Sequence, residues 1–181
     1  MDRSGPGGEP IRLFESASIV LYLADKYKQF VPDDFRLRSE VMNWVFWQMA
    51  GQGPMTGNFG HFFVYAPKDK SETRDYGVAR YGMEVQRLMS VLDKHLETRT
   101  YLVGEQYTIA DIVCFPWAHQ VLVGYVHSSG RTAAEFLTAS QYKNVAAWVE
   151  RLKQRPAVQR GLTVCKNGVA KPWLVMDVEG K

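Results

Sequence analysis

Cysteine is scarce in this sequence, and long apolar runs are missing altogether. Only Cys114 and Cys165 occur, and two cysteines far apart in the chain cannot build the disulfide framework of a small secreted domain. No apolar run approaches the roughly 20 residues that a membrane span needs, and the opening MDRSGPGGEP has no apolar signal core. We therefore expect a soluble protein of the reducing cytosol, with a cytoplasmic location and no membrane partner.

Metal ligands and a strong excess of one charge are also lacking. The four histidines have no metal-ligand spacing with acids or cysteines, so no metal is expected. The net charge is only +3, from 22 basic and 19 acidic residues, which excludes both a disordered polyelectrolyte and an obvious nucleic-acid partner. The small basic excess is compatible with an anionic ligand.

Apolar residues are plentiful, at 46% of the 181 residues, which is ample for a core in one or two domains. Residues 11–14 alternate as a strand does, and the apolar positions after Ser16 recur in helical fashion, with Ser16 as a good N-cap. A helix at about 35–50 is apolar on almost every side, which predicts a central, buried position. A long helix follows from about Thr73.

Glycine and proline divide this helical pattern. Four glycines and Pro54 lie within residues 51–60 and should break or kink the helix. The segment YTIADI is a capping box, in which Thr108 and Asp111 satisfy each other's backbone N–H groups. The apolar run after it belongs in the centre of a helical bundle. A last amphipathic helix carries Val145, Trp148, Val149 and Leu152.

The order of these motifs resembles the glutathione transferases. FESASIVLYLADKY looks like the last strand and helix of their thioredoxin-like domain, and YTIADI looks like the capping box of their helical domain. Within the family, the most similar members are the bacterial nu-class enzymes, which are glutathione-dependent disulfide-bond reductases related to the fungal nitrogen-regulator branch. The segments that carry this likeness are GNFGHFFVYAP, YGVARY, LVGEQYTIADI and AAEFLTASQYKNVAAWVERLKQRPAVQRG.

The resemblance implies a mostly α fold class: a transferase C-terminal helical bundle, preceded by the last strand or strands and helix of a thioredoxin-like α/β domain. Residues 1–30 would be the remnant of that glutathione-binding domain, residues 31–165 the all-helical domain, and residues 166–181 a C-terminal tail. It also implies glutathione as a co-substrate without a metal, disulfide substrates, and a homodimer.

By the same resemblance, Glu15 and Ser16 bind the γ-glutamyl end of glutathione. The Glu15 carboxylate can pair with the ligand's ammonium group. The Ser16 hydroxyl, together with the free N–H groups and the positive end of the helix dipole, can receive the ligand's carboxylate. The alternative is that the two residues only cap the helix.

The nu class binds two glutathione molecules, or one glutathione disulfide, in each site. The resemblance places Tyr76 and Arg80 against the second one, with the kinked backbone at Gly51 and Gln52. Tyr76 and Arg80 are one helical turn apart, and a guanidinium can hold a carboxylate through two hydrogen bonds. The alternative is an ordinary exposed tyrosine and arginine on a solvated helix face.

No catalytic residue is expected within this sequence. The family's chemistry uses the thiols of glutathione, Cys114 belongs to a buried apolar run and should be inert, and His61 is interpreted as structural. The thiolate-stabilising hydroxyl or amide of the family belongs upstream of Met1, so we expect the chain to be truncated and weak or inactive. The alternative function is a non-catalytic, transferase-like regulatory or protein-interaction module.

Overall fold

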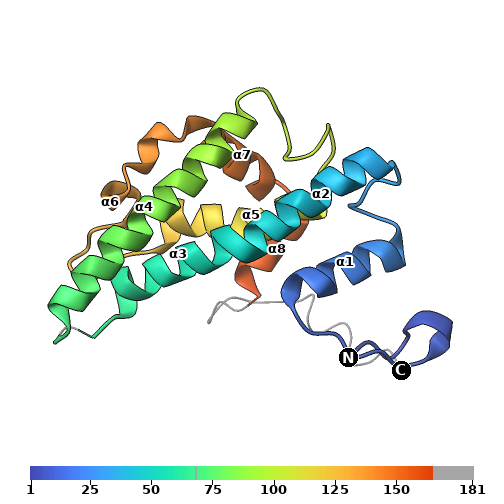
Figure 1. The fold of residues 1–181 in the computed structure, drawn as a ribbon. Helices are drawn as coiled ribbons and strands as arrows, with labels where there is room; N and C mark the ends of the chain where they lie inside the picture. Colours follow the sequence, from blue (N-terminus) through green and yellow to red (C-terminus); the bar gives the residue numbers. More distant parts are fainter. Residues whose placement is uncertain (68, 165–181) are drawn as a thin grey trace.

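The computed structural model describes residues 1–67 and 69–164, which are mostly helical (Figure 1). Its α-helices are α1 (Ser16–Tyr27), α2 (Phe35–Trp47), α3 (Gly53–Gly60), α4 (Ser71–Leu96), α5 (Ile109–His119), α6 (Ala133–Phe136), α7 (Lys143–Lys153) and α8 (Pro156–Thr163). Three π-helical turns, η2 (Gln48–Gln52), η3 (His61–Tyr65) and η4 (Gln120–Gly124), and two 3-10 turns, η1 (Pro6–Gly8) and η5 (Ala139–Gln141), complete the order. The mostly α fold class is confirmed; Cys165 and the predicted tail lie outside the described residues.

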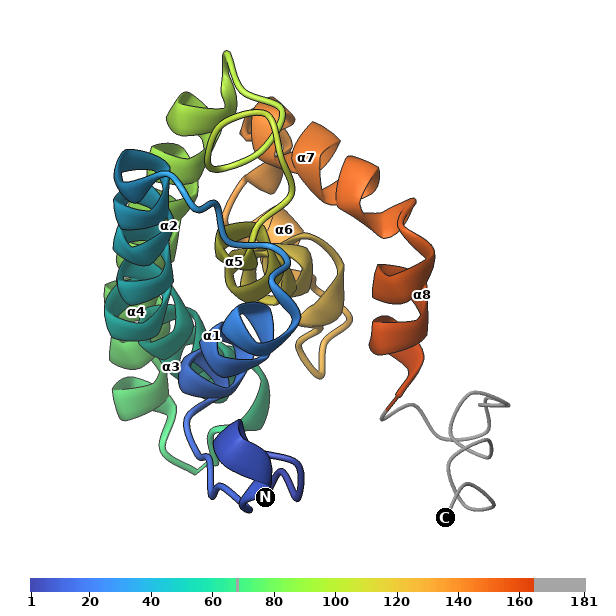
Figure 2. The same ribbon diagram turned by 90° about the vertical axis from the view of Figure 1, so that its right-hand side faces the viewer.

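Helix α5 lies at the centre of the bundle, with α1, α2 and α7 packed around it (Figure 2). Ala110, Cys114 and Ala118 are completely buried, because an apolar helix surface is covered when neighbours contact it on several sides. The predicted central position of this segment is confirmed. The predicted apolar face of α7 is buried as well, through Val145, Trp148, Val149 and Leu152.

The capping box at the start of α5 forms as predicted. The Asp111 carboxylate accepts hydrogen bonds from the Thr108 backbone N–H at 3.0 Å and from the Leu102 N–H at 3.1 Å. It also accepts one from the Trp148 indole at 2.9 Å, which ties α7 to α5. Burial raises the pKa of the Asp111 carboxyl, and these hydrogen bonds oppose the shift.

Of the break or kink predicted at the glycine-rich segment, the break is wrong. From α2 to η3 the chain remains helical, and the Gly53 N–H bonds to the Gln48 carbonyl across η2. A π turn absorbs one extra residue within a helix, which accommodates Pro54 without interrupting the element. The glycines allow close packing instead: a Cβ atom on Gly60 would lie 2.4 Å from the Tyr125 ring.

Helix α2 is not buried on all sides, contrary to the prediction for residues 35–50. Val41 and Val45 face the core, whereas Phe35 is 81% exposed and Phe46 is 68% exposed. The reason is position: α2 lies at the edge of the bundle and contacts α5 with one face only (Figure 2). Its outer apolar face has no partner within the part of the chain that the structure describes.

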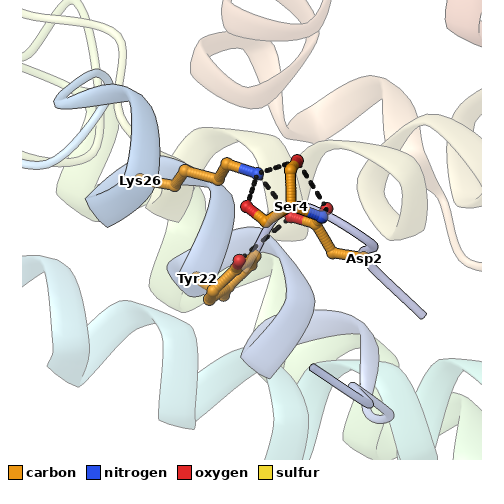
Figure 3. A network of polar contacts seen from close by, with 4 residues as sticks. All are labelled: Asp2, Ser4, Tyr22 and Lys26. Carbon is orange, nitrogen blue, oxygen red and sulfur yellow. Dashed lines mark hydrogen bonds and ion pairs between the residues drawn. The ribbon is translucent and has the colours of Figure 1, made fainter. Parts of the chain in front are cut away.

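The predicted strand at residues 11–14 is also wrong in this structure. Ile11 forms a single antiparallel bridge with Asp2, and no ladder follows among the described residues. The loop closed by this bridge is fixed to α1 by a polar network (Figure 3). The Asp2 carboxylate accepts hydrogen bonds from Lys26 Nζ at 2.5 Å and from the Tyr22 hydroxyl at 3.0 Å, and Lys26 Nζ also donates to the Ser4 carbonyl at 2.8 Å.

Candidate functional site

A cavity of about 610 Å³ lies between α1, the η2–α3 junction and α5. Each of the three segments contributes one wall, so the cavity depends on the packing of α1 against the bundle. The described residues that line it are all uncharged: Ser16, Val20, Gln48, Met49, Gly53, Pro54, Gly57, Asn58, Ile112, Val113, Pro116 and Trp117. Its size is in the range of small-molecule sites.

Ser16 lies in this cavity at the first residue of α1, and Glu15 precedes it as the N-cap residue. The sequence predicted Ser16 as the N-cap, which is wrong by one residue, and no side chain of the described residues caps the helix. The helix dipole and the first backbone N–H groups of α1 therefore remain available to a ligand.

The backbone at Glu15 is strained, with φ of 66° and ψ of 118°. Such a conformation costs about 1–3 kcal/mol for a residue other than glycine, and it often occurs at functional sites. The Glu15 side chain is exposed and makes no hydrogen bond with the described part of the chain. Helix capping alone therefore does not explain this pair of residues.

Gln48 lies in the cavity wall, although no motif in the sequence points to it. It is only 3% exposed, and its Nε2 atom lies 2.7 Å from the position that a Cβ atom on Gly53 would occupy. The π turn η2 sets this relation between Gln48 and Gly53. Apolar periodicity does not reveal a π turn, so the sequence offered only the polar residue in an apolar run as a signal.

Gly51 and Gln52 do not line the cavity. The Gln52 side chain is 2% exposed and points into the bundle, where its amide Nε2 donates to the Cys114 carbonyl at 3.2 Å. Its Oε1 atom has no hydrogen-bond partner among the described residues. Gly51 packs near Leu88 of α4. The structure thus brings Ser16 together with Gln48 rather than with Gln52.

Tyr76 and Arg80 lie near the start of α4, at the end of the bundle away from α1 (Figure 1). Tyr76 is 73% exposed, and Arg80 forms an ion pair with Glu84 at 3.1 Å. Hydrogen bonds from Arg87 and Arg80 lower the pKa of Glu84. Neither Tyr76 nor Arg80 lines the cavity that contains Ser16.

Cys114 and His61 do not line the cavity. Cys114 is completely buried, which confirms its predicted position in the core, and burial raises the pKa of its thiol. His61 packs edge-to-face on Phe62, with 5.2 Å between ring centroids. Among residues 1–67 and 69–164 there is no group of potential metal ligands, and no helix has the length and apolar character to cross a membrane.

Comparison with known proteins identifies relatives of this chain. Residues 59–156 match the family model for the glutathione S-transferase C-terminal domain. The disulfide-bond oxidoreductase YghU of Escherichia coli strain K12 is 45% identical over 155 residues, which are 86% of this chain and 51% of that protein. The chain spans about half the length of the curated relatives it matches.

Solved structures share the fold. A glutathione transferase from Burkholderia graminis, determined with two glutathione molecules per subunit, matches with a TM-score of 0.83 and 41% identity over 92% of this chain and 66% of that one. A glutathione transferase from Pseudomonas putida, determined with one glutathione disulfide per subunit, matches with a TM-score of 0.82 and 38% identity over 91% of this chain and 67% of that one. The bundle is therefore the helical domain of such transferases.

Proposed function

Because the chain belongs to the glutathione S-transferase family, we propose that it binds glutathione and takes part in glutathione-dependent reduction of disulfide bonds. The observation that carries this proposal is the start of α1, which no side chain of the described residues caps. Ser16 lines the cavity at this point, and the strained residue Glu15 directly precedes it. The same chemistry is supported by the relative YghU, a disulfide-bond oxidoreductase, and by the glutathione and glutathione disulfide bound in the similar solved structures.

The γ-glutamyl end of glutathione would bind at Glu15 and Ser16. The Glu15 carboxylate pairs with the ligand's ammonium group, while the Ser16 hydroxyl and the free N–H groups of α1 donate to its carboxylate. The helix dipole contributes about 0.3–1 kcal/mol, so the hydrogen bonds must supply most of the affinity.

The chemistry needs no cysteine of the protein. A glutathione thiolate attacks one sulfur of a disulfide R–S–S–R′, the S–S bond breaks, and R′–S⁻ leaves and takes up a proton. A second glutathione thiolate attacks the mixed disulfide, which releases R–S⁻ and forms glutathione disulfide. Two glutathione molecules are oxidised and one disulfide is reduced, and the protein contributes by holding the sulfur atoms close together.

The second glutathione would be bound by Tyr76 and Arg80, with the backbone at Gly51 and Gln52 close by. We propose that Tyr76 and Arg80 contact this second glutathione from α4, which packs against α3 of the cavity wall, and that the chain forms a homodimer. Residues 1–30 would act as part of a glutathione-binding domain, residues 31–165 as the helical domain and residues 166–181 as a tail.

The proposal is tested by titration calorimetry of the full chain with reduced glutathione. Ser16→Ala should weaken binding about tenfold, because a hydrogen bond to a charged group is worth about 1.5–3 kcal/mol. Ser18→Ala, two residues further along the same helix and exposed, is the matched control. Equal affinities for the unaltered chain and the Ser16 variant would contradict the assignment.

A reductase assay with 2-hydroxyethyl disulfide then separates an enzyme from a binding module. Turnover that depends on glutathione and falls in the Ser16→Ala variant supports the enzyme. Glutathione binding without turnover supports a non-catalytic module, and absence of binding contradicts the proposed glutathione site.

A further inference from the structure

Another cavity, of about 370 Å³, lies at the end of α1 that is remote from Ser16. We call it the Arg155 cavity. Its lining comes from the α1–α2 connection, the loop before α5 and the residue before α8: Lys28, Gln29, Phe30, Val31, Pro32, Gln106, Tyr107, Thr108 and Arg155. Helix α1 has 12 residues and is therefore about 18 Å long. The Arg155 cavity is thus separate from the cavity that contains Ser16.

The charged residues that line the Arg155 cavity all have the same sign. Lys28 and Arg155 are cations, and none of the described lining residues is a carboxylate. Asp33 and Glu105 are adjacent in sequence to lining residues, but they are exposed and do not line the cavity. None of the ion pairs among the described residues includes Lys28 or Arg155. The cavity therefore holds positive charge that an anionic ligand can neutralise.

The Arg155 guanidinium is held in place by the Tyr107 ring. Arg155 Cζ lies 3.8 Å from the centre of this ring, and Phe30 packs edge-to-face on the same ring, with 5.7 Å between centroids. Arg155 Nε is buried and has no hydrogen-bond partner among the described residues. A guanidinium that stacks on an aromatic ring directs its N–H groups along its own plane, where two of them can bind an oxyanion side by side. Because the stacking positions Arg155 in advance, less entropy is lost when a ligand binds.

The other lining residues indicate what else the ligand carries. Burial raises the pKa of Tyr107 to about 12, so its hydroxyl stays protonated near neutral pH and can donate a hydrogen bond. Phe30 is 40% exposed and forms an apolar wall together with Val31 and Pro32. The volume of about 370 Å³ is in the range of small-molecule sites. These features favour an oxyanion that is attached to an apolar group.

We propose that the Arg155 cavity binds small phosphate monoesters that carry an apolar or aromatic group. Arg155 holds two phosphate oxygens, Lys28 supplies the second positive charge, and the apolar group lies against Phe30. A phosphate monoester carries a charge of about −1.5 to −2 near neutral pH, which matches two cations better than the single charge of a carboxylate. This binding site is independent of the glutathione site at Ser16.

Titration calorimetry of the full chain with phenyl phosphate tests the inference. Arg155→Lys keeps the charge but loses the planar pair of N–H donors, so it should weaken binding at least about tenfold. Lys28→Met should weaken binding about two- to fivefold, because an exposed cation contributes less. Arg160→Met removes an exposed cation from α8 and is the matched control, which should leave the affinity unchanged. Thermal unfolding verifies that each variant is folded, and the Lys28 variant decides the question if the Arg155 variant does not fold.

Three further ligands show which parts of phenyl phosphate are recognised. Inorganic phosphate lacks the apolar group and should bind at least about fivefold more weakly, because the buried apolar area is lost. Benzyl alcohol lacks the charge and should show no measurable binding. Reduced glutathione should bind Arg155→Lys as it binds the unaltered chain, and it should not displace phenyl phosphate.

Several results would overturn the inference. They are absence of phenyl phosphate binding, equal binding by the unaltered chain and the Lys28 and Arg155 variants, and equal affinity for phenyl phosphate and either inorganic phosphate or benzyl alcohol. Displacement of phenyl phosphate by reduced glutathione would also overturn it, because the two ligands would then share one site. If phenyl phosphate binds as expected and reduced glutathione does not bind, the proposed function fails and this inference stands.

Discussion

Asp2 controls how the first eleven residues attach to α1. A hydrogen bond from Lys26 is the main reason that the pKa of the Asp2 carboxyl is lowered from its ordinary value of 3.8. A carboxyl whose pKa is lowered by folding stabilises the folded arrangement above its unfolded pKa, and this contribution is lost as the pH falls. The loop should therefore be held near neutral pH and released in acid.

We expect the heteronuclear NOE values of residues 3–10 to decrease as the pH falls below 3.8 in the unaltered chain. In Asp2→Asn they should already be low near neutral pH and change little with pH, because the amide carries no charge for Lys26. Glu9→Gln, in the same loop and exposed, is the control. A loop that stays ordered in Asp2→Asn would contradict the role given to this carboxylate.

The residues that the sequence predicted well are those with local signals. Thr108 and Asp111 are three positions apart, so their capping box can be recognised without knowledge of the fold. The hydrogen bond from Trp148 to Asp111 joins two helices and could not be predicted from spacing. The resemblance selected Gln52, whereas the structure has Gln48 in the cavity wall. Residue spacing could not predict this either, because a π turn changes which side chains share a helix face.

Among the helices, α3 contains two glycines, Gly57 and Gly60, that differ in how much space is left for a side chain. A Cβ atom on Gly60 would lie 2.4–2.7 Å from three atoms of the Tyr125 side chain, whereas one on Gly57 would lie 3.6 Å from the Trp117 ring. Gly60→Ala should thus destabilise the fold by about 1–3 kcal/mol through overpacking. Gly57→Ala, in ordinary contact, should be neutral or stabilising by up to about 1 kcal/mol.

Urea unfolding followed by circular dichroism provides the comparison. The two variants add the same methyl group to the same helix, so the difference between their free energies of unfolding isolates the contact with Tyr125. Equal values would show that the ring moves aside at little cost, and that close packing is not the reason for glycine at position 60.

The predictions for helices and strands failed where the result depended on which other segment packs against them. The apolar residues of α2 correctly predicted a helix, but Phe35 and Phe46 are exposed because no described segment covers that face. Likewise, the alternation at residues 11–14 indicates one apolar face but does not supply a neighbouring strand to pair with. Among the described residues this segment therefore forms a single bridge, from Ile11 to Asp2. The α5 and α7 predictions succeeded because both helices pack within the bundle.

At the scale of the whole molecule, we propose that the exposed apolar face of α2 is the contact surface of the proposed homodimer. Phe46→Glu places a charge on this face and should weaken dimerisation at least about tenfold, since an unpaired charge in an apolar interface is costly. Leu162→Glu is the control, because Leu162 is an exposed apolar residue on α8, on the opposite side of the bundle from α2 (Figure 2). Sedimentation equilibrium measures both variants, and equal effects would contradict an interface at α2.

The position of Trp117 has a spectroscopic consequence. Its indole lines the cavity and packs on Gly57, whereas Trp148 is completely buried in the core and Trp44 packs against Trp47. Among the tryptophans in the described part of the chain, Trp117 is thus the one whose emission responds directly to a molecule entering the cavity. Intrinsic tryptophan fluorescence should therefore report ligand entry without an added label.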